Sequence, residues 1–221
     1  MGALPFIVFL VFLAVFATYS YWFSEAAKFR RTIRAAQKMA IAQAVEGQLI
    51  RVSGTIQPLE TVLTAPLSKK PCVFFETTVE EYKSSGKSGK WVEIIRETNA
   101  CDFFIRDETG RALVNTSNMR VLPVKDHEQT SGTLNDASPE LEGFLAKHGH
   151  KSTGWIFNKN LRYREGVFSP GERIAVLGFA RREQDPDPMA AGSGYRDAPK
   201  RIVLEAPPNG ELLASDESEL V

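Results

Sequence analysis

Residues 72–82 read CVFFETTVEEY and residues 91–98 read WVEIIRET, and these two stretches decide the fold. Apolar residues alternate with polar ones in the first stretch, which places Val73 and Val79 on one face of a β-strand. The segment between them, KSSGKSGK at 83–90, is polar and contains glycine, which is typical of a turn. The sequence therefore predicts a β-hairpin built from these two strands.

Shorter β patterns on both sides of the hairpin extend this prediction. The candidate strands lie at 49–56, 61–63, 101–105, 112–115, 161–168, 173–180 and 201–204. Turns separate them, among them 107–110, where Gly110 is expected to take a positive φ, and the tight turn 169–172. The pattern predicts a mainly β fold, an antiparallel barrel-like (OB-like) domain over 48–217 with a tail at 218–221.

Two polar segments interrupt the β pattern. The first, 123–152, contains a helix signal, because Ser138 is a good N-cap and Pro139 is suited to the first helical position. We expect this short inserted helix to end near His148. The second segment, 185–199, is rich in Pro and Gly and is predicted to be a loop.

The N-terminal residues 3–23 (ALPFIVFLVFLAVFATYSYWF) carry no charge. With a rise of about 1.5 Å per residue, a helix of this length matches a hydrocarbon core roughly 30 Å thick. The sequence therefore predicts an N-terminal transmembrane helix. A cleaved signal peptide is the alternative, with a weak cleavage motif at 15–17, but no Lys or Arg precedes the apolar run, and the aromatic residues at 19–23 suit a membrane interface.

Residues 24–46 are predicted to form a basic juxtamembrane helix that ends before Gly47. Phe29 and Ile33 lie on one apolar stripe of it, opposite the basic face. We favour the interpretation that this stripe packs on the β domain. Two alternatives are that the helix lies on the lipid surface, or that it pairs with a second copy to form a homo-oligomer.

Charge predicts the orientation and the partners. Five basic residues follow the span within 24–46, so the positive-inside rule places the β domain in the cytoplasm, on a single-pass membrane protein of the inner or plasma membrane if the chain is bacterial. Residues 3–38 are then the expected contact with membrane lipid. The opposite end, 205–221, carries five acidic and no basic side chains. A net charge of 0 argues against nucleic acid as a partner.

Cysteines and histidines offer the first candidate site residues. Cys72 and Cys101 would form a disulfide in an exported domain, whereas the predicted cytoplasmic location favours free thiols. His127, His148 and His150 lack the ligand spacing of a structural zinc site. We therefore predict no metal ligands among them.

The remaining motifs also fall short of a site. The GKS at 86–88 resembles part of a phosphate-binding loop, but Glu81 stands where that motif requires glycine, and the segment joins two strands. The sequon at 115–117 is expected to be only a polar strand end. Glu76 and Glu80 lie on a strand where alternate residues face solvent. We predict no catalytic residues, no cofactor-binding residues and no cofactor.

Several phrases in fixed order resemble a known module. They are VSGTI (52–56), LTAPL (63–67), PCVFF (71–75), FFIRDETG (103–110), YREG (163–166), PGE (170–172), VLG (176–178), IVLEAP (202–207) and LLAS (212–215). Together, beside an apolar span, they are similar to the GIDE or BAM ("beside a membrane") domain. That domain occurs in membrane-anchored mitochondrial and plastid ubiquitin E3 ligases and in bacterial membrane proteins.

The resemblance implies a membrane-tethered domain that recruits a protein partner, and the chain differs from the ligases, which carry a second span after this domain and then a RING finger. Their catalytic module is a RING finger with eight Cys or His zinc ligands, whereas this chain has two Cys and three His. We therefore expect a non-catalytic interaction or scaffolding module with an unknown protein partner. The alternative is an enzyme or an accessory subunit of a membrane enzyme complex, either ligase-like or an unrecognised hydrolase. In the mitochondrial relatives the domain faces the intermembrane space, whereas the charges here predict the cytoplasm.

Overall fold

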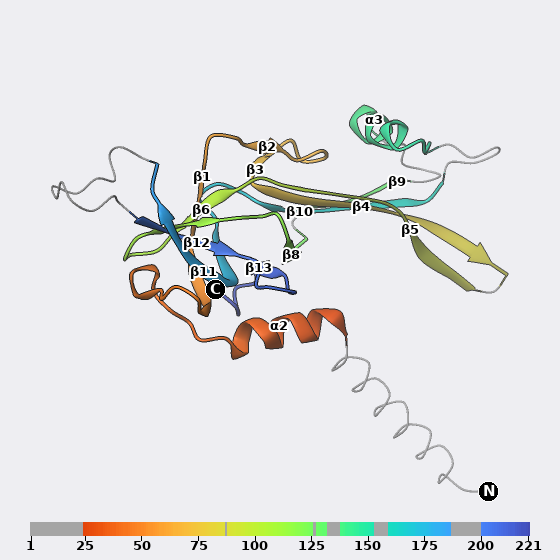
Figure 1. Cartoon of the computed structure of the whole chain (residues 1–221). Helices are drawn as coiled ribbons and strands as arrows, with labels where there is room; N and C mark the ends of the chain where they lie inside the picture. Colours follow the sequence, from red (N-terminus) through yellow and green to blue (C-terminus); the bar gives the residue numbers. More distant parts are fainter. Residues whose placement is uncertain (1–23, 87, 126, 132–137, 153–158, 187–199) are drawn as a thin grey trace, which may run out of the picture.

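The computed structural model describes residues 24–86, 88–125, 127–131, 138–152, 159–186 and 200–221. These residues form a mainly β protein with a closed five-stranded barrel and a long sheet that projects from it (Figure 1). One α-helix lies above the projecting sheet and another lies under the barrel. The predicted mainly β class, the barrel and the short inserted helix are confirmed.

Five strands close the barrel. They are β1 (Leu49–Pro58), β6 (Phe103–Arg106), β7 (Arg111–Val114), β11 (Arg173–Gln184) and β12 (Lys200–Glu205). The order is β1-β6-β7-β12-β11, and β1 pairs with β11 to complete the circle. All these pairs are antiparallel except β7 with β12. The expectation of a purely antiparallel barrel is therefore wrong at this pair, because strand directions cannot alternate all the way round an odd number of strands.

The barrel core follows from alternation along its strands. On β1, Ile50, Val52 and Ile56 point inward, and none is more than 1% exposed. Phe103 and Ile105 of β6 meet them from the neighbouring strand. Two further strands, β13 (Leu212–Ser215) and β8 (Met119–Leu122), extend the sheet beyond β11, and the short strands β2 (Leu63–Thr64) and β3 (Pro71–Cys72) pair with each other.

The projecting sheet contains the predicted hairpin. Its strands are β4 (Phe74–Ser85), β5 (Ser88–Ala100), β9 (His127–Ser131) and β10 (Leu161–Phe168), in the order β5-β4-β10-β9. The helix α3 (Pro139–Lys147) covers one face of this sheet (Figure 1). As predicted, Ser138 caps α3, its Oγ accepting from the Leu141 amide at 3.4 Å, and the C-cap is His148. We call β4, β5, β9, β10 and α3 the arm.

The helix α2 (Glu25–Ala35) is shorter than expected. The prediction of one helix over 24–46 is wrong beyond Ala35, because the following residues pair with the barrel instead. The Met39 amide donates to the Arg51 carbonyl at 2.9 Å, and the Arg51 amide donates to Gln37 at 3.0 Å. A single 3₁₀ turn, η1 (Ile41–Gln43), follows.

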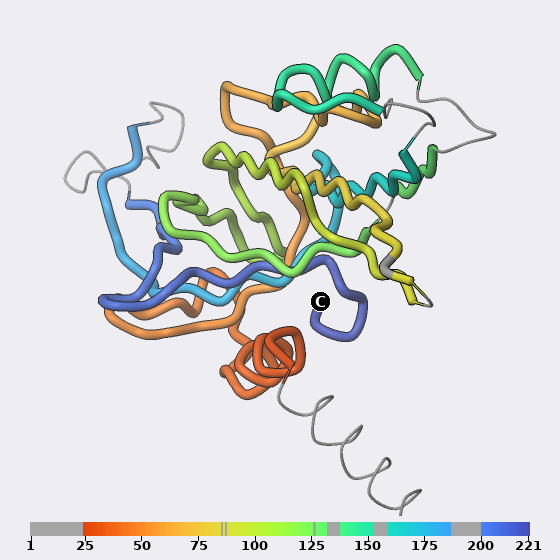
Figure 2. Tube along the Cα trace, turned by 90° about the vertical axis from the view of Figure 1, so that its right-hand side faces the viewer, coloured from red at the N-terminus to blue at the C-terminus, as the bar shows by residue number. Residues whose placement is uncertain are grey.

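The apolar stripe of α2 packs on the barrel, as the favoured interpretation predicts. Phe29 and Ile33 are buried against Ala175 and Leu177 of β11. Leu220 joins the same cluster and is 1% exposed. The prediction that 218–221 lies outside the domain is therefore wrong, because this apolar side chain fills the gap between α2 and the barrel. Figure 2 shows the C-terminus beside α2.

Complementary charges hold the tail on α2. Arg30 donates two hydrogen bonds to Glu217, at 2.7 and 2.6 Å. Arg34 forms an ion pair with Glu219. The basic segment at 28–38 and the acidic segment at 205–221 thus lie against each other in the structure, so their opposite charges balance locally.

The two predicted turns differ in outcome. Gly171 takes a φ of +86°, as a tight turn requires. Gly110 does not take a positive φ. Asp107 closes its turn instead, because Oδ1 accepts from the amides of Thr109 at 2.7 Å and Gly110 at 3.0 Å. Oδ2 accepts from the Ile41 amide at 2.8 Å, which ties η1 to the barrel.

The predicted transmembrane segment, 3–23, lies outside the described residues, as does 187–199 of the predicted loop. Of the helices that the structure describes, none combines the length and apolar character needed to span a bilayer.

Candidate functional site

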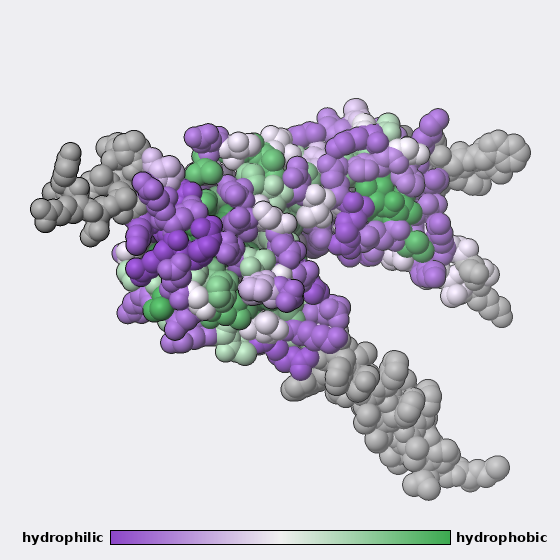
Figure 3. Space-filling model, viewed as in Figure 1, coloured by the Kyte–Doolittle hydropathy of each residue, from purple (hydrophilic) through white to green (hydrophobic). Residues whose placement is uncertain are grey.

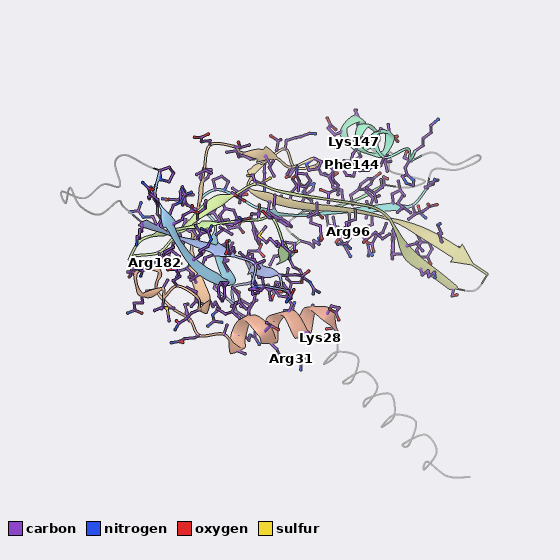
Figure 4. The ribbon with its side chains drawn as sticks, in the orientation of Figure 1. Lys28, Arg31, Arg96, Phe144, Lys147 and Arg182 are labelled. Atoms are coloured by element: carbon purple, nitrogen blue, oxygen red, sulfur yellow. The ribbon has the colours of Figure 1, made fainter. Side chains whose placement is uncertain are left out.

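The face of the arm opposite α3 is covered by paired charges. Arg96 Nη1 lies 2.6 Å from Glu76, and Arg96 Nε lies 3.0 Å from Glu93. Figure 4 shows Arg96 on the side of the sheet away from Phe144 and Lys147 of α3. The same face carries Arg162 with Glu80 at 2.7 Å and Arg164 with Glu128 at 2.8 Å. Glu76 and Glu80, noted in the sequence as strand carboxylates, are thus neutralised by arginines.

The far end of this face is aromatic. Tyr82 and Trp91 face each other across the hairpin with ring centroids 5.4 Å apart. The Arg162 guanidinium lies 4.4 Å from the centre of the Trp91 ring, a cation–π geometry. Both rings remain exposed. Figure 3 shows that hydrophilic residues cover most of one side of the described molecule and that hydrophobic residues form smaller patches between them.

The outer edge of the arm is the strand β5, which among the described residues pairs only with β4. Backbone bonds fix which groups point outward. The Cys101 amide donates to the Val73 carbonyl at 2.9 Å, one step beyond the pair Phe74–Ala100. Since bonded and non-bonded pairs alternate in an antiparallel ladder, the backbone groups of Ala100, and of every second residue before it, face away from β4.

Arg96 and Thr98 are two of the β5 residues whose backbone groups face away from β4. The Ala100 amide supports this assignment, because its partner is not β4 but the Asn99 side chain, at 2.9 Å. The sheet alternates in the same way on its faces, so the Arg96 and Thr98 side chains lie on the charged face, whereas Glu97 lies on the α3 face. The arm therefore presents a strand edge with backbone donors and acceptors directed outward.

The α3 face has one cluster of titratable groups. Glu97 accepts from Lys147 Nζ at 2.8 Å and lies 2.8 Å from His148 Nε2. Partial burial raises the pKa of Glu97, but the hydrogen bonds with Lys147 and His148 outweigh it, and the net pKa lies below the usual value. The His148 ring also packs on Phe144, with centroids 4.9 Å apart. These contacts fix the end of α3 to β5.

The other sequence candidates lie apart. His127 is on β9 at the opposite edge of the arm sheet from β5, and among the described residues no three His, Cys, Asp or Glu side chains converge as metal ligands would. Gly86 and Ser88 lie at the tip of the hairpin between β4 and β5, as predicted, and Lys87 lies outside the described residues. Asn115 Oδ1 accepts from the Ser117 amide at 3.0 Å within a turn.

Cys72 and Cys101 are both free thiols, which is the alternative that the sequence analysis favours over a disulfide. Burial raises the pKa of Cys72 to about 11, with further contributions from Glu165 and Cys101. Burial also raises the pKa of Cys101. A catalytic cysteine needs its thiolate, so these shifts oppose nucleophilic catalysis by either residue.

Sequence reasoning missed the role of Glu165, a fully buried carboxylate on β10. Its two oxygens accept from the amides of Leu67 and Ser68, each at 2.9 Å, and Oε1 also accepts from Thr77 Oγ1 at 3.0 Å. These bonds tie the loop between β2 and β3 to the base of the arm. The only signal in the sequence is a charged residue within a strand next to the apolar run Gly166–Phe168.

Comparison with known proteins adds no assignment: no family model, no curated protein and no solved structure matches this chain. The fold and the arm therefore define the class by themselves, as a mainly β barrel protein with a projecting, open-edged sheet.

Proposed function

We propose that this protein is a membrane-anchored, non-catalytic interaction module similar to the GIDE domain, and that its arm binds an extended segment of a partner protein along β5. The observation that carries the proposal is the outward-facing backbone of β5 at Arg96 and Thr98. An exposed strand edge pairs readily with another strand, and many domains recognise peptides in this way.

The side chains around the edge favour a specific partner over general aggregation. Arg96 and Glu93 place both charge signs beside the free edge, and such charges protect edge strands from unspecific pairing. The exposed Tyr82–Trp91 pair adds an aromatic contact at the far end of the hairpin. Aromatic residues and arginine are the side chains that contribute most at protein interfaces.

The barrel is the scaffold in this proposal. A closed barrel of five strands with a crossover between β7 and β12 supports the OB-like description of the domain. Its closure gives the arm a rigid base, and Glu165 fastens that base to the loop between β2 and β3. Binding elements commonly project from such rigid scaffolds.

The anchor proposal rests on the apolar sequence of 3–23 and on α2. Because Arg30 and Arg34 bind the acidic tail and Lys28 pairs with Glu25 at 2.9 Å, contact between α2 and anionic lipid falls mainly to Arg31, which lies on the side of α2 away from the barrel (Figure 4). This arrangement leaves the apolar stripe of α2 on the barrel, so a homo-oligomer through α2 would use its polar face.

Photo-crosslinking in the expressing cells tests the binding edge. A photoreactive residue at position 96 is expected to give a discrete adduct with one protein, and Thr98→Pro in the same chain should abolish it. Proline removes an outward N–H without breaking the β4–β5 ladder, because edge strands tolerate it at such positions. Thr98→Val keeps the N–H and should keep the adduct.

A photoreactive residue at Glu140, exposed on α3, is the positional control. The same adducts from positions 96 and 140, or an adduct that survives Thr98→Pro, would refute binding along β5.

A further inference from the structure

A hollow of about 700 Å³ opens on the barrel wall, and none of the residues that line it belongs to the arm. It lies where the segment Lys38–Ala40 and the turn between β6 and β7 leave a gap along β1. Its walls come from four parts of the chain: residues 38–40, β1 from Ser53 to Gln57, the turn from Arg106 to Thr109, and Arg173 at the start of β11.

Three cations surround this hollow. Arg106 and Arg173 are both paired with Thr55, one from each side, so they stand in one row across three neighbouring strands. Side chains of paired residues point to the same face of a sheet. With strands about 4.8 Å apart, the two arginine backbones are about 10 Å apart on the outer face of the barrel. Lys38 approaches from the covering segment.

These cations differ from the other arginines of the barrel and arm. Within the described part of the chain, no ion pair or hydrogen bond engages the side chains of Lys38, Arg106 or Arg173. By contrast, Arg181 bonds to Glu205 at 2.9 Å and Arg201 bonds to Glu183 at 2.7 Å. Arg106 and Arg173 lie on either side of β1 and face the same hollow, so their positive charges add there.

A buried polar atom in the wall of the hollow also lacks a partner among the described residues. Ser53, which is 7% exposed and lines the hollow, has a buried hydroxyl without a hydrogen bond. Buried polar groups are normally satisfied, so this hydroxyl points to a missing acceptor.

The acidic residues of the hollow do not supply that acceptor. Asp107 is occupied by the amides of Ile41, Thr109 and Gly110. Glu108 is exposed at the rim and has no bond to a described residue. The hollow therefore combines three unpaired cations with one uncommitted carboxylate.

We propose that this hollow binds a phosphate group, presented either by a soluble phosphate ester or by a lipid headgroup. Arg106 and Arg173 would hold two of its oxygens from opposite sides, since guanidinium groups are the preferred partners of phosphate. Lys38 adds a third positive charge, and the Ser53 hydroxyl, whose hydrogen is free to rotate, is a further donor in the wall of the hollow.

Calorimetric titration of the full chain in zwitterionic detergent with inorganic pyrophosphate tests this site. Saturable binding is expected, and Arg106→Gln and Arg173→Gln should each weaken the Kd about 10-fold. Ser53→Ala should weaken it less. The matched control is the double variant Lys83→Gln/Lys90→Gln, which removes two charges at the exposed hairpin tip and should leave the Kd unchanged.

Absence of saturable binding up to about 1 mM pyrophosphate, or equal losses in the hollow and control variants, overturns the proposal. Thermal unfolding of each variant checks that the substitutions of these exposed arginines leave the fold intact. Repeating the titration in nanodiscs identifies the source of the phosphate. Phosphatidate in the bilayer should raise the apparent pyrophosphate Kd if lipid headgroups occupy the hollow, and it should have no effect if the ligand is soluble.

Discussion

The barrel and the arm differ in how the backbone hydrogen-bonding groups at the edges of their sheets are satisfied. The barrel closes its sheet, so β1 and β11 satisfy each other and each barrel strand has neighbours on both sides. Among the described residues, the arm leaves its sheet open, with β5 at one edge and β9 at the other. The difference indicates where stability and binding reside: a closed sheet keeps its backbone groups for itself, whereas an open one offers them to a partner.

The hydrophobic core of the barrel is also larger than that of the arm. The barrel core runs through all five strands and includes residues from η1, β8 and β13. The arm core is a separate cluster of seven buried residues under α3: Val79, Ile95, Leu141, Phe144, Leu145, Leu161 and Tyr163. A smaller core makes local opening of the arm cheaper than unfolding of the barrel.

The largest expected effect is in the barrel. Phe103→Ala removes a fully buried ring from the centre of its core and should lower the free energy of unfolding by about 3–5 kcal/mol. Chemical denaturation should show one transition, shifted for barrel and arm together, because the arm depends on the folded barrel to which its strands are joined. An arm that unfolds at the wild-type denaturant concentration in this variant would show that it is an independent domain.

Next comes the junction between the two regions. Glu165→Ala leaves the Leu67 and Ser68 amides without acceptors and should cost about 3 kcal/mol. Hydrogen exchange is expected to accelerate first in the loop between β2 and β3. Glu81→Ala, which removes a partly exposed carboxylate from β4, is the control and should cost under about 0.5 kcal/mol.

A smaller effect is expected within the arm core. Leu145→Ala opens a cavity under α3 and should lower the free energy of opening of the arm by about 2–3 kcal/mol. The barrel should keep its wild-type stability. Amide protection should fall in α3 and in β5 while that of β1 and β11 stays at the wild-type level. Equal loss of protection in the barrel strands would contradict the separation of the two cores.

Acid should produce the smallest effect, at the contact between Glu97 and α3. The pKa of Glu97 is lower in the folded protein than in the unfolded chain, so its contribution to stability is present above the unfolded pKa and is lost as the pH falls through the folded pKa. Protection of α3, corrected for intrinsic exchange, should therefore decrease below about pH 4. In Glu97→Gln this pH dependence should disappear.

The sequence predicted those features that local chemistry determines. The alternation of residues 72–82 and 91–98 predicted the hairpin, and the Ser138–Pro139 pair predicted the start of α3. Both signals act within one element, where period and capping are sufficient.

The features it missed depend on distant parts of the chain. Residues 36–46 have good helix propensity, but α2 ends at Ala35 because Gln37 and Met39 find backbone partners on β1. The acidic composition of the tail does not indicate that it packs on α2, where Glu217 pairs with Arg30 and Leu220 is buried. Likewise, the row formed by Arg106 and Arg173 exists only through the register of three strands.

Residue-resolved hydrogen exchange at Thr98 tests the central claim most directly. In the purified chain, the outward-facing Thr98 amide should exchange rapidly, while the Glu97 amide, bonded within the β4–β5 ladder, should be protected. In the native membranes, where the partner is present, the Thr98 amide should become protected and the protection of Glu97 should stay as it was. A Thr98 amide that exchanges equally fast in both settings would contradict the account that β5 is a binding edge.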